Sequence, residues 1–225
     1  MEKKYIHSGF TVVELLIVIC VSCIAATLLL PAFQNAVSRG RLDACSNNQR
    51  NIGTALIVYC CDNCGFIPNL ADGMEKYSTP VIRMPGGTVF ALGRLLKQRY
   101  IDNAECFGCP DSPGCDGMSV KKLWSSDDKI VWSGYLYRSQ DTGFIPQLNA
   151  PENLRKAILM DFACRSQTGE DVSPHKYRFS NLLYPDNHVE CRRNSAEPYT
   201  LYTASVAGQR KITPECTALW QNADH

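Results

Sequence analysis

The sequence lacks the features that mark most enzymes and most nucleic-acid-binding proteins. Its 225 residues carry 23 basic and 22 acidic side chains, so the net charge of +1 gives no indication of nucleic-acid binding. Histidine is scarce and scattered, and no motif pairs a histidine with a nucleophile. There is also no internal repeat and no low-complexity tract. We therefore expect no enzymatic activity and no nucleic-acid partner.

Cysteine, by contrast, is abundant. Twelve cysteines are many for a cytosolic protein of this size, and they indicate an oxidising, extracytoplasmic compartment or a metal site. Ten of them lie outside the apolar N-terminal run, and ten cysteines allow too many pairings for the sequence to select one. These ten are Cys45, Cys60, Cys61, Cys64, Cys106, Cys109, Cys115, Cys164, Cys191 and Cys216.

A long apolar run occupies residues 10–30. As a helix it would be about 32 Å long, which matches the hydrocarbon core of a bilayer. Lys3 and Lys4 precede it, so the positive-inside rule places the first residues in the cytoplasm and the remainder outside. The run predicts a single-pass membrane protein with its head outside the cytoplasm.

Two kinds of cleaved secretion signal fit this run poorly. A secretory signal peptide would need a small-x-small cleavage site, and only Ala25-Ala26 offers a weak one. A lipoprotein signal would end at Cys20 or Cys23, but the residues preceding each cysteine do not match that pattern. An uncleaved signal anchor is a further alternative, but it leaves the carboxylate of Glu14 without a purpose.

Cleavage after Gly9 would give Glu14 a purpose. Phe10 would become the new N-terminus, and its free amine would lie on the same helix face as Glu14. An acid in lipid is costly unless it is paired. The N-terminal amine of a neighbouring, slightly shifted subunit is a natural partner, so Glu14 predicts a packed helical filament.

The stretch "KKYIHSGFTVVELLIVI" resembles the class III signal of type IV prepilins and type II secretion pseudopilins. That family has a short basic leader, Gly at the cut, Phe after it and Glu at the fifth mature position. The resemblance implies that a prepilin peptidase cuts after Gly9 and N-methylates Phe10. It also implies that Glu14 acts in assembly and that Pro31 is the helix-kinking proline of the family.

Beyond the apolar run, the pattern predicts that the same helix continues as an amphipathic segment over residues 31–62. Apolar residues recur every three to four positions, and Gln49 falls among the charged residues on the opposite, solvent face. Gly65 and Pro68 end the helix. We expect residues 63–225 to form the globular head.

The head is expected to be a small α+β domain. Residues 87–101 predict a short helix, and strands are predicted at 129–138, 156–162, 179–184, 188–193 and 200–206. Asp186 and Asn187 form the tip of a hairpin turn. The whole predicts a pilin-like α+β fold, in which an antiparallel sheet covers one long N-terminal helix.

A second resemblance, to a large subfamily of pseudopilin-like proteins, covers much of the chain. The subfamily carries a C-x2-N-x3-I-G-x-A-x3-Y-x2-D-N-x-G-x2-P helix, an F-x-C-P-x-D stretch and a C-terminal H-x9-DG motif. The first pattern runs here from Cys45 to Pro68, and "CFGCPD" lies at 106–111. The H-x9-DG-like motif lies within residues 175–190 and includes His175, Asn181, Asp186 and Asn187. It departs from the family pattern in two ways. Ten residues, not nine, separate His175 from Asp186, and Asn187 replaces the turn glycine.

Two metal sites are conceivable in the head. Cys61, Cys64, Cys106 and Cys109 form two C-x2-C pairs with the spacing of a four-thiolate zinc site, although the gap between the pairs is long. The same cysteines could form disulfides or a redox couple. Calcium is the other candidate, because major pseudopilins of type II secretion bind it in a C-terminal loop. The carboxylates available for it are Asp111, Asp116, Asp161 and Asp186.

These observations leave two functional hypotheses. In the first, the chain is a structural subunit of a secretion pseudopilus or type IV pilus-like filament. Its partners would be the prepilin peptidase, other pilin or pseudopilin subunits and an inner-membrane assembly platform. In the second, it is a membrane-anchored, cysteine-rich domain that binds metal or exchanges redox equivalents. Only the first hypothesis needs the processing and assembly residues Gly9, Phe10 and Glu14.

Overall fold

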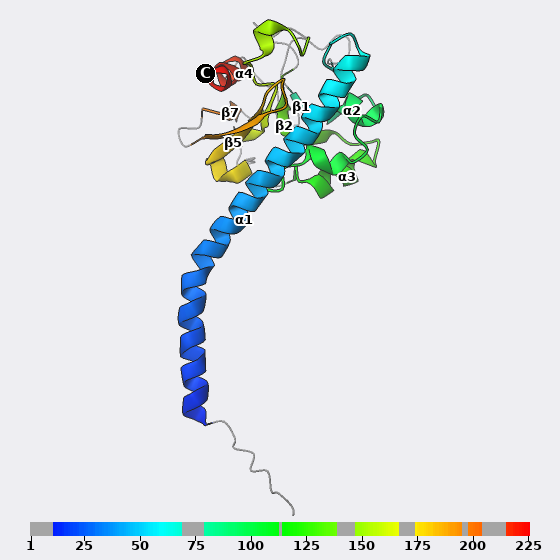
Figure 1. Ribbon diagram of the computed structural model, residues 1–225. Helices are drawn as coiled ribbons and strands as arrows, with labels where there is room; N and C mark the ends of the chain where they lie inside the picture. Colours follow the sequence, from blue (N-terminus) through cyan, green and yellow to red (C-terminus); the bar gives the residue numbers. More distant parts are fainter. Residues whose placement is uncertain are drawn as a thin grey trace, which may run out of the picture. The chain divides into compact units, whose positions relative to one another are not determined.

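A computed structural model describes residues 11–68, 79–112, 114–138, 147–166, 174–194, 198–203 and 215–225. Gly9 and Phe10, the predicted processing residues, lie outside the described residues. The chain divides into two units, residues 1–40 and 41–225. The division falls within the first helix, so the two parts of that helix are described separately (Figure 1).

The first helix, α1, spans Val12–Asp62 and includes Pro31. This confirms the predicted single long helix, which ends as expected where Cys64 and Gly65 adopt positive φ angles of 55° and 85°. All side chains from 12 to 40 are exposed. By length and composition, α1 is apolar enough to cross a membrane.

The second part of α1, residues 41–62, is amphipathic and belongs to the head. Its buried side chains recur every three to four positions, at Cys45, Gln49, Ile52, Leu56 and Tyr59. The prediction that Gln49 lies on the solvent face was wrong, because Gln49 is fully buried and hydrogen-bonded to groups on the sheet. Helical spacing gave the position of the buried stripe but not its full width.

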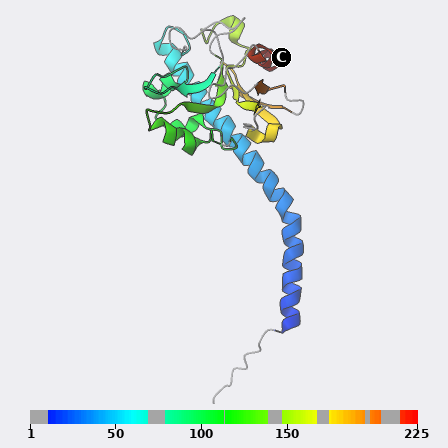
Figure 2. The ribbon, with the colours of Figure 1, turned by 180° about the vertical axis from the view of Figure 1, so that it is seen from behind.

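A five-stranded antiparallel sheet lies against this part of α1, which passes in front of the sheet in Figure 1 and behind it in Figure 2. The strand order is β1-β2-β3-β5-β6. The strands are β1 (Thr79–Arg83), β2 (Val131–Tyr137), β3 (Leu159–Asp161), β5 (Phe179–Leu183) and β6 (Val189–Arg193). A separate parallel pair consists of β4 (Ala163–Ser166) and β7 (Thr200–Thr203).

The predicted strands over 129–193 are therefore present, and β5 and β6 form the expected hairpin. Two strands, β1 and β4, were not predicted. Strand β1 is an edge strand that contains Pro80, and a proline inside an apolar run argues against a strand on sequence grounds.

The helices of the head are short. They are α2 (Gly93–Lys97), α3 (Gly117–Trp124) and α4 (Glu215–Asp224), with 3-10 turns η1 (Ala104–Phe107), η2 (Pro151–Asn153) and η3 (Pro174–Tyr177). Only α2 was predicted, and over a longer range. It is shorter because Val89 forms a β-bridge with Arg83 and the Phe90 N–H donates to the Ile82 carbonyl.

Alternation along the strands produces two apolar clusters. Tyr135, Leu159 and Leu183 face the cluster that contains Ile52 and Leu56 of α1. Their sequence neighbours Leu136, Met160 and Leu182 belong to the other cluster, which contains Leu219 and Trp220 of α4. Since successive side chains of a strand point to opposite faces, α1 and α4 cover opposite faces of the sheet.

Candidate functional site

Glu14 begins α1 as part of a capping box. The Thr11 backbone N–H and hydroxyl donate to Glu14 Oε2 (2.9 and 2.8 Å), and the Glu14 N–H donates to Thr11 Oγ1 (3.2 Å). This reciprocal pair is a standard helix start. Glu14 therefore has a local partner within a single chain, in addition to the predicted partner on a neighbouring subunit.

The helical surface that follows Glu14 is apolar and exposed. No other charged residue occurs between Val12 and Ser38. Its large apolar side chains are 39–80% exposed; they are Val12, Val13, Leu15, Leu16, Ile17, Val18, Ile19, Val21, Ile24, Leu28, Leu29, Leu30, Phe33 and Val37. So much exposed apolar surface requires lipid or other protein to cover it.

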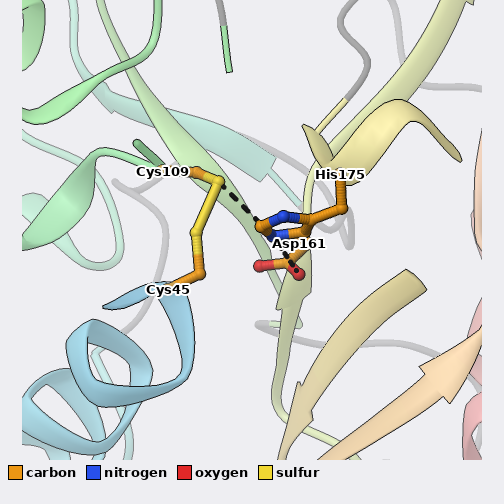
Figure 3. Close-up of side chains that lie close together, drawn as sticks. All are labelled: Cys45, Cys109, Asp161 and His175. Carbon is orange, nitrogen blue, oxygen red and sulfur yellow. Dashed lines mark hydrogen bonds and ion pairs between the residues drawn. A yellow bond between two sulfur atoms is a disulfide. The ribbon is translucent and has the colours of Figure 1, made fainter. Parts of the chain in front are cut away.

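Among the described residues of the head, four reactive side chains form a compact group, which we call the buried cluster: Cys45, Cys109, Asp161 and His175 (Figure 3). Cys45 lies on α1, Cys109 follows η1, Asp161 ends β3 and His175 lies in η3. One potential ligand atom from each residue lies within 4.8 Å of the others, and all four residues are buried. Cys45 and Cys109 form a disulfide with a Cα–Cα distance of 5.4 Å.

Close backbone packing positions Cys109. A Cβ atom on Gly134 of β2 would lie 2.5 Å from the Cys109 nitrogen, so only glycine allows this approach. The Asn48 side chain donates to the Gly108 carbonyl (3.1 Å) and ties the loop to α1. The disulfide joins the same two segments.

Asp161 is a buried carboxylate held by neutral donors. Gln49 Nε2 donates to Oδ1 (3.0 Å), and the Asn181 backbone N–H donates to Oδ2 (2.8 Å). Asn181 also donates from its side chain to the Leu42 carbonyl (3.2 Å). These contacts fix the carboxylate between α1, β3 and β5.

His175 completes the cluster in an unusual backbone conformation. His175 and Lys176 both have positive φ angles, 52° and 51°, which are costly for residues other than glycine. His175 Nε2 lies 3.3 Å from Asp161 Oδ2 and 3.6 Å from Cys109 Sγ. Its Nδ1 is buried without a hydrogen bond, 3.6 Å from Asp111 Oδ2, and Asp111 in turn pairs with Arg41 at 2.8 Å.

The predicted four-thiolate site is arranged differently. Cys61 and Cys64 are exposed at the end of α1, Cys106 is half-buried, and Cys109 is in the disulfide. Within the described residues, only the buried cluster brings three or more potential cysteine, histidine or carboxylate ligands together. Cys109 is thus the single residue that this cluster shares with the predicted zinc site.

The candidate calcium carboxylates do not converge on one loop. Asp116 caps α3, where hydrogen bonds from Ser119 hold the pKa of its carboxyl below the usual value. Asp186 accepts from the His188 N–H (3.2 Å) in the hairpin turn. Asp111 pairs with Arg41, and Asp161 belongs to the buried cluster.

The hairpin turn contacts α1 directly. Asn187 has φ of 69°, as expected of a residue that replaces a turn glycine, and its side-chain amide donates to Thr54 Oγ1 (3.1 Å). A Cβ atom on Gly53 would lie 2.1 Å from Asn187 Oδ1. Gly53, the glycine of the helix motif, therefore provides the space in which the Asp186-Asn187 turn sits.

Comparison of the chain with protein-family models, with curated proteins and with solved structures finds no match.

Proposed function

We propose that this protein is a prepilin-type subunit of a type II secretion pseudopilus or type IV pilus-like filament. The observation that carries the proposal is the first part of α1, where exposed apolar side chains extend from Val12 to Val37 with one carboxylate at the start. A signal anchor alone would need the apolar length, and the helix cap that Glu14 provides does not need a negative charge.

The resemblance of residues 3–19 to prepilin signals supplies the processing step. A prepilin peptidase would cut after Gly9 and methylate the amine of Phe10. The apolar helix would hold the mature chain in the inner membrane with the head in the periplasm. An assembly platform would then draw subunits into a filament whose core is formed by residues 10–30. The protein performs no chemistry of its own in this account.

Glu14 has two candidate roles that can be separated. Its carboxylate caps the helix through Thr11, and in a filament it would pair with the Phe10 amine of a neighbouring subunit. The capping role needs only a hydrogen-bond acceptor, so glutamine can perform it. The pairing role needs the negative charge.

Two substitutions therefore test the proposal. Glu14→Gln keeps the capping box and removes the charge, whereas Thr11→Ala removes the cap and keeps the charge. In the native host, both variants should be processed and held in the membrane. Glu14→Gln should reduce the amount of subunit in sheared filaments by about tenfold or more, because the charge pair between subunits is lost. A pair that contributes about 1.4 kcal/mol to assembly corresponds to that factor.

Thr11→Ala is the matched control and should enter filaments at close to the wild-type level. Normal assembly of Glu14→Gln, together with loss in Thr11→Ala, would show that Glu14 serves only as a cap and would contradict the pairing role. The mature mass of each variant, measured in the same membrane fraction, separates an assembly defect from a processing defect.

A further inference from the structure

We infer that the buried cluster, Cys45, Cys109, Asp161 and His175, binds one Zn²⁺ ion when its two cysteines are reduced. Two thiolates, an imidazole and a carboxylate are the ligand types that zinc takes in four-coordinate protein sites. The four residues come from four separate parts of the head, α1, the loop after η1, β3 and η3. The inference is independent of filament assembly.

Two of the six distances between the ligand atoms match the edges of a zinc tetrahedron. With Zn–N and Zn–O bonds of about 2.0–2.1 Å and Zn–S bonds of about 2.3 Å, an N–O edge is about 3.3 Å and an N–S edge about 3.6 Å. His175 Nε2 lies 3.3 Å from Asp161 Oδ2 and 3.6 Å from Cys109 Sγ. One imidazole nitrogen thus faces both other kinds of ligand, at separations that a shared ion allows.

The surrounding groups also match a metal site. A histidine that binds metal through one ring nitrogen usually directs the other toward a carboxylate or carbonyl. Here the unpartnered Nδ1 of His175 faces Asp111 Oδ2 at 3.6 Å, and Arg41 holds Asp111 in place. Asp161 is oriented by Gln49 and by the Asn181 N–H, as ligating carboxylates are by outer hydrogen bonds.

A cation would also offset a buried charge. Asp161 is 1% exposed; Gln49 and the Asn181 N–H donate to it as neutral groups, and His175 Nε2, 3.3 Å away, is a cationic partner only when the imidazole is protonated. A buried carboxylate without a compensating charge is costly. Zn²⁺ at the centre of the cluster would contact this carboxylate directly.

The disulfide and the ion exclude each other. Two thiolates on one zinc ion lie about 3.8 Å apart, which is far longer than an S–S bond. A phosphine reductant breaks the Cys45–Cys109 bond, supplies two electrons and takes an oxygen atom from water, and the two water protons yield two thiols. Binding of Zn²⁺ then displaces both thiol protons. Either state fastens α1 to the loop that carries Cys109.

The test uses the full-length chain in detergent. One portion is left oxidised, and another is reduced with a trialkylphosphine and stripped with a chelator. Both are then exposed to Zn²⁺ and freed of unbound metal. We expect about one zinc per reduced chain and none per oxidised chain, as a closed four-ligand site requires. Co²⁺ in place of Zn²⁺ should give the visible absorption of a tetrahedral, thiolate-bound ion.

Variants identify the ligands. His175→Gln and Asp161→Asn should each weaken zinc retention by about tenfold or more, whereas the double variant Cys61→Ser/Cys64→Ser should retain zinc like the wild type. The comparison of oxidised and reduced wild-type chain does not depend on the folding of any variant. Absence of zinc from the reduced wild-type chain would overturn the inference. So would retention in His175→Gln combined with loss in the Cys61/Cys64 double variant.

Discussion

Single short polar side chains organise the local backbone of the head, and Asp116 is the clearest case. Its carboxylate accepts from the Ser119 N–H (3.1 Å) and from the Ser119 hydroxyl (2.6 Å) at the start of α3. These bonds lower the pKa of Asp116 below its ordinary value, although burial acts in the opposite direction. The ionised form is therefore the one that stabilises the fold.

Asp116→Ala should lower the free energy of unfolding by about 1 kcal/mol near neutral pH, the usual cost of losing an N-cap. Because the pKa is lower in the folded state, this stabilisation is present above the unfolded value and lost as pH falls through the folded value. Urea unfolding at neutral and at acidic pH measures the free energy of unfolding of the wild type, of Asp116→Ala and of Asp116→Asn. Asn keeps a hydrogen-bond acceptor that cannot ionise, so its contribution should not depend on pH. An Ala variant as stable as the wild type at neutral pH would contradict the capping role of Asp116.

The residues of the buried cluster were visible in the sequence, but their grouping was not. Cys45 and His175 belong to the subfamily motifs, Cys109 to the predicted zinc site and Asp161 to the candidate calcium ligands. Cys45 and Cys109 are 64 residues apart, and Cys109 and His175 are 66 apart. Contacts at such separations depend on how α1, the sheet and η3 pack, which local patterns do not encode.

Among the elements, the second part of α1 has small residues, Gly53 and Thr54, where it contacts the β5–β6 hairpin. Thr54 accepts from the Asn187 side chain, and Gly53 leaves the space that Asn187 and Leu183 occupy. Leu183 lies 3.1 Å from the position of an added Cβ. A side chain at position 53 would push the turn away from the helix.

Gly53→Ala should therefore destabilise the head by about 1–3 kcal/mol, the usual cost of overpacking. Gly40→Ala is the matched control, because nothing lies within 4 Å of the added Cβ. The favourable helix propensity of alanine over glycine should make Gly40→Ala neutral or slightly stabilising. Thermal unfolding of the two variants in the same detergent distinguishes these effects, and equal melting temperatures would show that the contact with the turn is not constraining.

Elements with strong periodicity or turn residues could be predicted, and those fixed by long-range pairing could not. The long helix, four of the five strands of the main sheet and the Asp186-Asn187 turn follow from local pattern. Strand β4 was missed because it is short and pairs in parallel with β7 in a separate two-stranded sheet. Helix α4 was also missed. Its Trp220 is completely buried in the apolar cluster on the second face of the sheet, a long-range contact that local sequence does not show.

For the whole molecule, α1 contains two segments with different surroundings. Residues 12–40 expose every side chain, whereas residues 41–62 form part of the apolar core of the head. A helix with this division fits a subunit whose first segment is covered by lipid and then by other subunits. The prediction of an α+β fold with a long helix is confirmed, while filament assembly stays a proposal.

The central claim is tested most directly by the intact mass and N-terminal sequence of the protein extracted from membranes of its native host. The account predicts a mature chain that begins with N-methylated Phe10. A chain that retains Met1 would instead be a plain signal anchor, and a chain that begins near Thr27 would be an ordinary secreted protein. Either result would contradict the assignment as a prepilin-type subunit.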